Sequence, residues 1–321
     1  MTFVSWRNPS HSRAPLPACG PANPNWASTT TRCSPAWGTP NHKSPHGKKK
    51  RSSDVSTPEP HAPGTLQSFK RGHVGHVVFN NPRKFNAMNY DMWAALPQVM
   101  QDFVDDADIR VIVLSGAGDK AFVSGADISQ FDTMRTGDAN LVYSQASEAG
   151  YAAVLDCPKP TVVQIQGICM GGGLGLALNC DVRICASNAK FRMPAGRLGL
   201  GYAFDGVKRF TEIVGVGHTA DLFFSARIFD AHDALAMGLV KQVVAPEALS
   251  ATVDDYTRTV CENAPLTLAA AKRALLELRK NPEQRDMALV QAMVNACFAS
   301  QDYQEGRQAF AAKRPPVFKG H

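Results

Sequence analysis

Residues 164–181 read QIQGICMGGGLGLALNCD, in which an apolar run leads through three consecutive glycines into the start of a predicted helix. Glycine has no side chain to cover the backbone, and the first N–H groups of a helix have no partner within it. Such groups, together with the helix dipole, favour a negatively charged ligand. The same glycines also fit close packing of a strand on a helix, or a phosphate cradle, although the usual phosphate motifs are missing.

The chain has 321 residues, of which 44% are hydrophobic and 19% charged. This is the composition of a globular protein with a substantial core, in one large or two modest domains. The longest apolar stretch, residues 161–178, is interrupted by Gln164, Gln166 and several glycines. A membrane-spanning helix needs about 20 consecutive apolar residues, so we expect no membrane insertion.

The net charge of +6 lies entirely in residues 1–64, which hold eight Lys or Arg and two Asp or Glu. The rest of the chain is neutral overall, so we expect no nucleic-acid partner. Residues 1–64 are also rich in Pro and Ser, which predicts a disordered basic leader. The run GKKKRSS at 47–53 fits a solvated charge cluster, a localisation signal or a polyanion-binding segment. The leader as a whole also fits a transit peptide or a misassigned start codon.

The eight cysteines form no C-x-x-C pair and no Cys/His spacing typical of zinc, so we expect no metal site. Several of them lie in apolar segments, as free thiols usually do. The first residues also lack the apolar region of a secretory signal. These features favour a reducing cytoplasm.

From Leu66 onward the pattern is that of an α/β domain. A helix capped by Asn89 is predicted over 89–108, and helices with few strand signals follow from residue 217 to the end. Strands are predicted at 66–82 (two, about a glycine turn), 109–117, 161–168 and 181–186. Alternating strands and helices followed by a helical tail predict an α/β core, residues 65–255, and a C-terminal helical region, residues 256–321.

Five segments resemble, in order, the crotonase (enoyl-CoA hydratase/isomerase) superfamily. They are NNPRKFNAMN at 80–89, KAFVSGADISQF at 120–131, KPTVVQIQGICMGGGLGLALNCDVRICASNAKFRMP at 159–194, LFFSARIFDAHDALAMGLVKQVV at 222–244 and SQDYQEGRQAFAAKRPPVFKGH at 300–321. The resemblance covers nearly all of residues 66–321. It implies a crotonase-like core of repeated strand-helix units with a C-terminal helical trimerisation region, in a homotrimer or a hexamer.

The resemblance implies an enzyme that binds an acyl-CoA thioester and stabilises an enolate-like anion at the thioester carbonyl. Two backbone N–H groups hold that oxygen, and the matching positions here are Ala126, in SGAD, and Gly172, in GGG. The neighbouring Gly125, Gly171 and Gly173 belong to the same binding loops, and the helix after Gly173 adds its dipole. Coenzyme A enters as part of the substrate, and no separate cofactor is implied.

The sequence departs from the family's hydratases at two positions. Those enzymes have a glutamate two residues after the glycine triplet and another after the Pro of the next loop. The matching residues here are Gly175 and Ala195. Because general acid and base groups are each worth about 10²–10⁴-fold in rate, the resemblance predicts that the usual two-glutamate hydration is weak or lost.

Other residues are candidates to take over the proton transfers. Asp205 is one, although it equally fits an N-cap of the following helix. Glu148, on the helix before the glycine strand, is the second, and a solvated surface glutamate is its simpler interpretation. Arg197 fits either a substrate carboxylate or a surface salt bridge. Tyr202 is expected to line the acyl pocket.

The resemblance also marks positions near coenzyme A. These are Arg83, Lys84, Asn86, Ala87, Asp127 and Ile128, with Phe318 and Lys319 reaching the nucleotide bound to a neighbouring subunit. Solubility of the loop is the alternative role of Arg83 and Lys84. The expected function is therefore an acyl-CoA lyase, isomerase or hydrolase working through an enolate. The alternative is a non-catalytic acyl-CoA-binding or scaffold subunit.

Overall fold

The computed structural model describes residues 64–130 and 137–321, which all belong to the second of two units, Met1–Pro58 and Glu59–His321, defined by the chain's contacts. The predicted leader lies outside the described residues, apart from Gly64. The first half of the described chain comprises β1 (Thr65–Arg71), β2 (Val74–Asn80), η1 (Pro82–Lys84), α1 (Tyr90–Asp105), β3 (Val111–Gly116), β4 (Ala121–Val123), η2 (Ile128–Gln130), α3 (Gly137–Leu155), β5 (Thr161–Ile165), β6 (Ile168–Met170), α4 (Gly172–Asn179), β7 (Val182–Ala186) and β8 (Lys190–Arg192).

The second half is mostly helical. Its elements are α5 (Ala195–Leu198), α6 (Phe204–Ser225), β9 (Phe229–Asp230), α7 (Ala231–Ala236), β10 (Gln242–Val244), η3 (Pro246–Ala248), α8 (Leu249–Cys261), α9 (Pro265–Leu278), η4 (Pro282–Gln284), α10 (Met287–Ala299) and α11 (Gln301–Ala311). Two short strands, β9 and β10, thus interrupt the helical region past residue 217. The helix α8 continues across the expected core boundary at residue 255.

The strands form a six-stranded sheet in the order β1-β2-β3-β5-β7-β10 and a four-stranded sheet in the order β4-β6-β8-β9. Neighbouring strands are parallel, except for β1 with β2 and β8 with β9, which are antiparallel. Parallel pairing of strands joined by helices is the α/β arrangement expected from the alternating sequence pattern. The predicted fold class is therefore confirmed.

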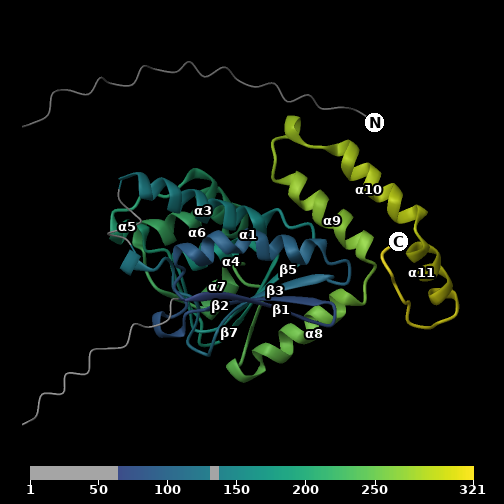
Figure 1. The fold of residues 1–321 in the computed structure, drawn as a ribbon, viewed down its shortest axis with the longest axis horizontal. Coiled ribbons are helices and arrows are strands. Elements are labelled where there is room, and N and C mark those ends of the chain that lie inside the picture. The colour runs from purple at the N-terminus through teal and green to yellow at the C-terminus, as the bar shows by residue number, and fades with distance from the viewer. Residues whose placement is uncertain (1–63, 131–136) are drawn as a thin grey trace, which may run out of the picture. The chain divides into compact units, whose positions relative to one another are not determined.

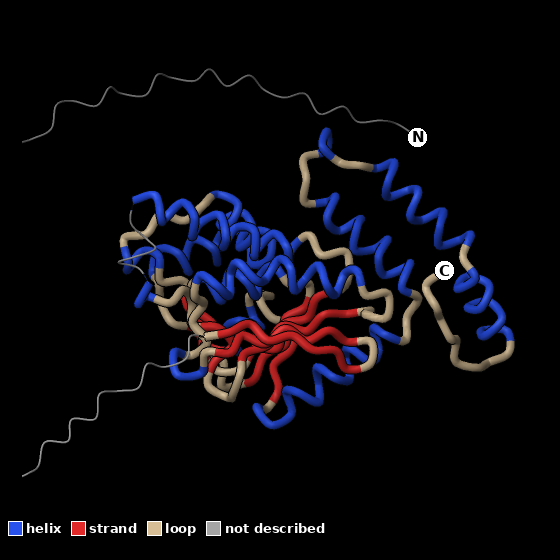
Figure 2. The backbone as a smooth tube through the Cα atoms, in the orientation of Figure 1, coloured by secondary structure: helices blue, strands red, loops and turns tan. Residues whose placement is uncertain are grey.

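Two hydrophobic layers enclose the larger sheet. Side chains of a strand alternate between its faces, and β3 shows this clearly. Val111 and Val113 pack with Val253 of α8, whereas Ile112 and Leu114 belong to the main core. That core includes residues of α1, α3, α4 and α6, which Figures 1 and 2 show on the opposite side of the sheet from α8. The helices that will form the candidate site thus share one layer.

Local capping explains where the helix α1 begins. The Asn89 side chain accepts a hydrogen bond from the Met92 N–H at 2.8 Å, as predicted for an N-cap.

The C-terminal helices are attached to the core by polar contacts. Arg110 donates to the carbonyls of Cys261 and Phe318 at 2.6 and 2.7 Å. Lys272 of α9, nearly buried, pairs with Asp181 at 2.6 Å.

Candidate active site

A cavity of about 640 Å³ lies among α3, α4, α5, α6 and the loop after β4. Its lining includes most of the residues that the sequence proposed for chemistry, together with several that it did not. The predicted residues that line it are Gly125, Ala126, Ile128, Glu148, Gly171, Gly172, Gly175, Ala195, Tyr202 and Asp205. Residues from segments far apart in the chain therefore meet around one space.

The two predicted amide donors face each other at one end of this cavity. A Cβ built on Gly172 would stand 3.8 Å from the Ala126 nitrogen, and a Cβ built on Gly125 would stand 3.8 Å from the Gly172 nitrogen. Met88 pairs with the backbone on both sides of Ala126, because its N–H donates to the Gly125 carbonyl and its carbonyl accepts from Asp127, both at 2.8 Å. In the described ranges, neither the Ala126 nor the Gly172 N–H donates to another protein group.

The three glycines have three different roles in the structure. Gly171 is the N-cap of α4 with φ +50°, a conformation that favours glycine, and its N–H donates to the Arg192 carbonyl at 2.9 Å. Gly172 is the first residue of α4, so the helix begins two residues earlier than the sequence suggested. Gly173 does not line the cavity, and its predicted role in binding is corrected to packing. A Cβ there would stand 2.1 Å from the Val123 carbonyl oxygen.

Two tyrosine hydroxyls occupy the space beside Gly175. A Cβ on Gly175 would lie 3.1 Å from the Tyr202 hydroxyl and 3.3 Å from the Tyr151 hydroxyl. Tyr151 donates to the Gly172 carbonyl at 3.1 Å. The Tyr202 hydroxyl makes no hydrogen bond with any described protein group, and burial raises its pKa to about 12. A neutral phenol donor therefore faces the cavity beside Gly175.

Both candidate carboxylates line the cavity from different helices. Glu148 lies on α3, and Asp205 lies in the first turn of α6. Both side chains are exposed. The N-cap of α6 is Ala203, so the alternative that Asp205 caps this helix is wrong. Arg197 is exposed on α5 and is not among the lining residues, which corrects its predicted place in the substrate pocket.

The predicted coenzyme A residues separate into two groups. Lys84 donates to Asp127 at 2.7 Å and to Ser129 at 2.8 Å. Burial raises the pKa of the Asp127 carboxyl, but the hydrogen bonds from Lys84 and Ser129 outweigh it and hold that pKa below its usual value. Ile128 is 72% exposed in η2 and lines the cavity, and Arg83 is exposed in η1 next to Lys84. Arg83, Lys84 and Ile128 are thus accessible, and the buried Asp127 carboxyl is held by Lys84.

Asn86 and Ala87 belong to the second group, because both are buried. The Asn86 side chain accepts from the Asn81 N–H at 3.0 Å and donates to the carbonyls of Ala117 and Ala121 at 2.9 and 2.8 Å. Its hydrogen-bonding groups are thus used within the protein. The Asn86 side chain therefore supports the loop, and the position of Asn86 near coenzyme A stays a prediction.

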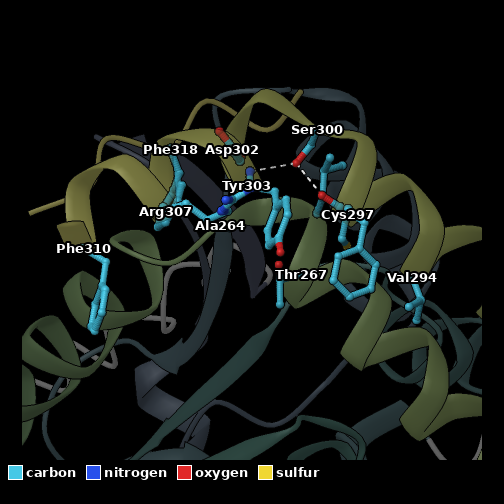
Figure 3. A pocket seen from close by; sticks show the side chains of 13 residues that line it. Ala264, Thr267, Val294, Cys297, Ser300, Asp302, Tyr303, Arg307, Phe310 and Phe318 are labelled. Carbon is cyan, nitrogen blue, oxygen red and sulfur yellow. Dashed lines mark hydrogen bonds between the residues drawn. The ribbon is translucent and has the colours of Figure 1, made fainter.

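Phe318 and Lys319 lie away from this cavity, at the end of the chain. Phe318 lines a second cavity of about 610 Å³ among α9, α10 and α11, where Figure 3 shows it beside Arg307 and Asp302. Asp302 is buried and accepts the backbone N–H groups of Lys319 and Gly320, both at 2.7 Å. Within the described chain, Phe318 and Lys319 do not contribute to the lining around the paired amides.

Sequence reasoning missed a set of cations at the cavity. Lys208, Arg209 and Arg279 are all among its lining residues. A basic pair in a predicted helix carries no signal of its own, and Arg279 is about 70 positions away from it.

In residues 64–130 and 137–321, no three His, Cys, Asp or Glu side chains are grouped to hold a metal ion. No helix in these ranges is long and apolar enough to cross a bilayer.

Comparisons with known proteins agree with the fold. The short-chain-enoyl-CoA hydratase of Clostridium acetobutylicum is 31% identical over 245 residues, covering 76% of this chain and 94% of that protein. The crotonyl-CoA hydratase of Syntrophomonas wolfei is 32% identical over 249 residues, covering 78% and 95%. A crystal structure described as an enoyl-CoA hydratase/carnithine racemase, from Magnetospirillum magneticum, superposes with a TM-score of 0.75 at 32% identity, covering 80% and 96%.

The family model for enoyl-CoA hydratase/isomerase matches residues 70–321, which include all of the described chain except residues 64–69. Relatives, solved structures and this match all point to the same superfamily, which confirms the resemblance seen in the sequence. The chain belongs to the enoyl-CoA hydratase/isomerase (crotonase) family.

Proposed function

We propose that this protein is an acyl-CoA enzyme that stabilises an enolate at the thioester carbonyl. The observation that carries the proposal is the pair of facing amides of Ala126 and Gly172, which have no acceptor in the described part of the chain. The oxygen of a thioester placed between them would accept two N–H groups at the positive end of α4. Each preorganised donor of this kind contributes about 3–4 kcal/mol to catalysis.

The reaction we propose is not the usual two-glutamate hydration. Gly175 and Ala195 carry no acid or base, and both line the cavity. The space beside Gly175 is occupied by the hydroxyls of Tyr151 and Tyr202. A phenol that keeps its proton donates hydrogen bonds but does not remove a proton from carbon. Double-bond isomerisation, decarboxylation and carbon–carbon cleavage use an enolate without that carboxylate pair, and hydrolysis would use the same amides to hold the oxyanion of a tetrahedral intermediate.

Asp205 and Glu148 are the proposed proton acceptors. Their carboxylates are the two acidic side chains among the described residues that line the cavity, and each is exposed to it or to solvent. A general base must come within about 3 Å of the proton it removes, directly or through one water. One of the two is expected to reach the α- or γ-carbon of a bound acyl chain.

Mass spectrometry in heavy water tests this proposal. A panel of acyl-CoA thioesters is incubated with the full chain, because each candidate reaction and α-deuterium uptake leave different mass changes. We expect turnover or uptake, and a loss of about 10²–10⁴-fold in Asp205→Asn or Glu148→Gln. Asp221→Asn is the matched control, because Asp221 lies on α6 outside the lining residues. Tight thioester binding with no mass change across the panel would instead support a non-catalytic binding subunit.

We further propose a homotrimer or hexamer in the cytoplasm, with coenzyme A present only as part of the substrate. The exposed apolar side chains of the C-terminal helices support the assembly. Leu278, Phe298 and Phe310 are 64%, 62% and 87% exposed, and apolar groups of this size are usually covered by another surface. Light scattering after size-exclusion chromatography would give three or six chains per particle, and a monomer would contradict the proposal.

A further inference from the structure

Three cations surround a single carboxylate at the cavity. Arg209 and Arg279 both reach Glu212, at 3.2 and 3.0 Å, and Lys208 lies 4.0 Å from it. Lys208 also donates to the Arg279 carbonyl at 3.1 Å. All three cations line the cavity, whereas Glu212 does not. The cluster therefore has an excess of positive charge on the side that faces the cavity.

The two guanidinium groups keep unused donors. Arg209 donates from Nε to the Leu178 carbonyl and from Nη1 to Glu212. Arg279 donates only from Nε, also to Glu212. The remaining terminal nitrogens of both arginines have no hydrogen-bond partner in the described chain. They are open to solvent, because among the described residues only Arg273 Nε is a buried side-chain nitrogen or oxygen without a partner. Burial and the neighbouring charge of Arg279 lower the pKa of Arg209. A second anion beside Glu212 would offset the repulsion between the two arginines.

The helix α4 sets the distance from these cations to the paired amides. The Gly172 N–H opens this helix, and the Leu178 carbonyl that accepts from Arg209 lies near its other end. Six residues of helix span about 9 Å at the usual rise per residue. The cavity lining includes both ends and Gly175 between them. The thioester position and the cations therefore lie at two ends of one cavity, separated by roughly the length of a medium acyl chain.

We propose that the preferred substrates are CoA thioesters whose acyl chain carries a carboxylate, held by Arg209 and Arg279. This inference rests on the proposed function, because it places the thioester at Ala126 and Gly172. Guanidinium groups bind carboxylates through two parallel hydrogen bonds, which an alkyl chain end does not make. Binding of a substrate carboxylate, which the sequence suggested for Arg197, is thus assigned to Arg209 and Arg279.

Nearby carboxylates offset only part of the charge of the three cations. Asp205 lies one turn before Arg209 on α6, but it makes no ion pair with any of the three cations in the described structure. Glu212 is shared among all three. A substrate carboxylate would bring the local charge close to balance, whereas an uncharged chain end would leave two partly buried cations facing an apolar group. That contrast predicts discrimination between charged and uncharged chains.

Calorimetric titration of the full chain at physiological salt tests the inference. The probes are succinyl-, adipyl- and suberyl-CoA, each compared with the alkyl thioester of the same length, butyryl-, hexanoyl- or octanoyl-CoA. We expect a preference of about 10- to 100-fold for the dicarboxylic member at one or more lengths, the range of one charged hydrogen-bonded contact. Arg279→Gln should abolish that preference, chiefly by weakening the binding of the dicarboxylic thioesters.

Lys280→Gln is the matched control, because it removes the same charge from the adjacent residue, which pairs with Glu277 and does not line the cavity. It should keep the preference. Equal affinity within every pair of thioesters, or a preference that survives in Arg279→Gln, would overturn the inference while leaving the proposed function intact. Failure of the wild-type chain to bind any of the six thioesters would overturn the proposed function as well.

Discussion

The Tyr202 hydroxyl lies 3.1 Å from the point where a Cβ on Gly175 would stand. Tyr202 comes from the loop before α6 and Gly175 from the middle of α4. The ring of Tyr202 packs edge-on against Phe210 and Phe223, with ring centroids 6.3 and 5.1 Å away. It also packs on Gly206, where a Cβ would approach the ring to 2.3 Å. The Tyr202 hydroxyl thus lies in space that a side chain at 175 would need.

Tyr202→Phe is therefore expected to reduce turnover while preserving the fold. The substitution removes one donor near the developing negative charge, so kcat should fall about 10- to 100-fold. The hydroxyl has no partner among the described residues, so the free energy of unfolding should change by less than about 0.5 kcal/mol. Steady-state kinetics and urea unfolding measure both effects. Tyr256→Phe, on α8 away from the cavity, is the control, and equal kcat in wild type and Tyr202→Phe would refute this role.

The effect of pH on the difference in kcat between wild type and Tyr202→Phe is also predicted. Because burial raises the pKa of Tyr202 to about 12, the phenol stays protonated below about pH 10. The ratio of wild-type to Tyr202→Phe kcat should therefore be constant between pH 6 and 10. A ratio that rises with pH in this range would show a phenolate acting as a base, contrary to the proposed donor role.

Alanine should destabilise the fold strongly at Gly173 and little at Gly175, although these glycines are only two residues apart on α4. A Cβ on Gly173 would meet the Val123 carbonyl oxygen at 2.1 Å, a backbone atom that cannot step aside. Gly173→Ala should cost about 3 kcal/mol or more of unfolding free energy. A Cβ on Gly175 meets only the ends of two tyrosines, and alanine favours a helix. Gly175→Ala should therefore stay within about 1 kcal/mol of wild type. Similar losses in urea unfolding of the two variants would contradict this packing.

Local signals in the sequence predicted most strands of the six-stranded sheet, but not the short strands β4, β8, β9 and β10, and not all of the site. The Asn89 cap, the strands around residues 111–116 and the glycines before α4 follow from nearest neighbours in the chain. Asp205 was ambiguous because its pattern fits both a cap and a site, and only the actual helix start at Phe204 separates the two. Long-range residues such as Arg209 and Arg279 meet through Glu212. No local pattern encodes that meeting, because it depends on how α6 and α9 pack.

The end of the chain is expected to loosen in acid. Glu305 pairs with Arg314 at 2.6 Å and accepts the Val317 N–H at 2.9 Å. The hydrogen bonds from Arg314 and Val317 lower its pKa from 4.5 to about 2. A lowered pKa means that the folded state binds this proton less readily than the unfolded state. The stabilisation is therefore complete above about pH 4.5 and is lost as the pH falls toward 2.

Replacing Glu305 by Gln separates the stabilisation due to the Glu305–Arg314 ion pair from that of the other carboxylates. The difference in melting temperature between wild type and Glu305→Gln should be largest at pH 5 and above, and should shrink as the pH falls to 3 and below. Glu283→Gln, in the short helix η4, is a control without such an ion pair in the described structure. A difference that stays constant with pH would contradict the assignment.

The paired amides are the centre of this account, and Gly172→Ala tests them most directly. Its Cβ would stand 3.2 Å from the Tyr151 hydroxyl and 3.8 Å from the Ala126 nitrogen, in the space assigned to the thioester oxygen. Gly217→Ala, where a Cβ meets no atom within 4 Å, is the control.

The measurement is the rate of α-deuterium uptake or turnover of acyl-CoA thioesters in heavy water, with unfolding midpoints recorded in parallel. We predict that wild type and Gly217→Ala react alike and that Gly172→Ala is slower by about 100-fold or more with its fold intact. A wild-type rate of zero across the panel, or an undiminished rate in Gly172→Ala, would contradict the account.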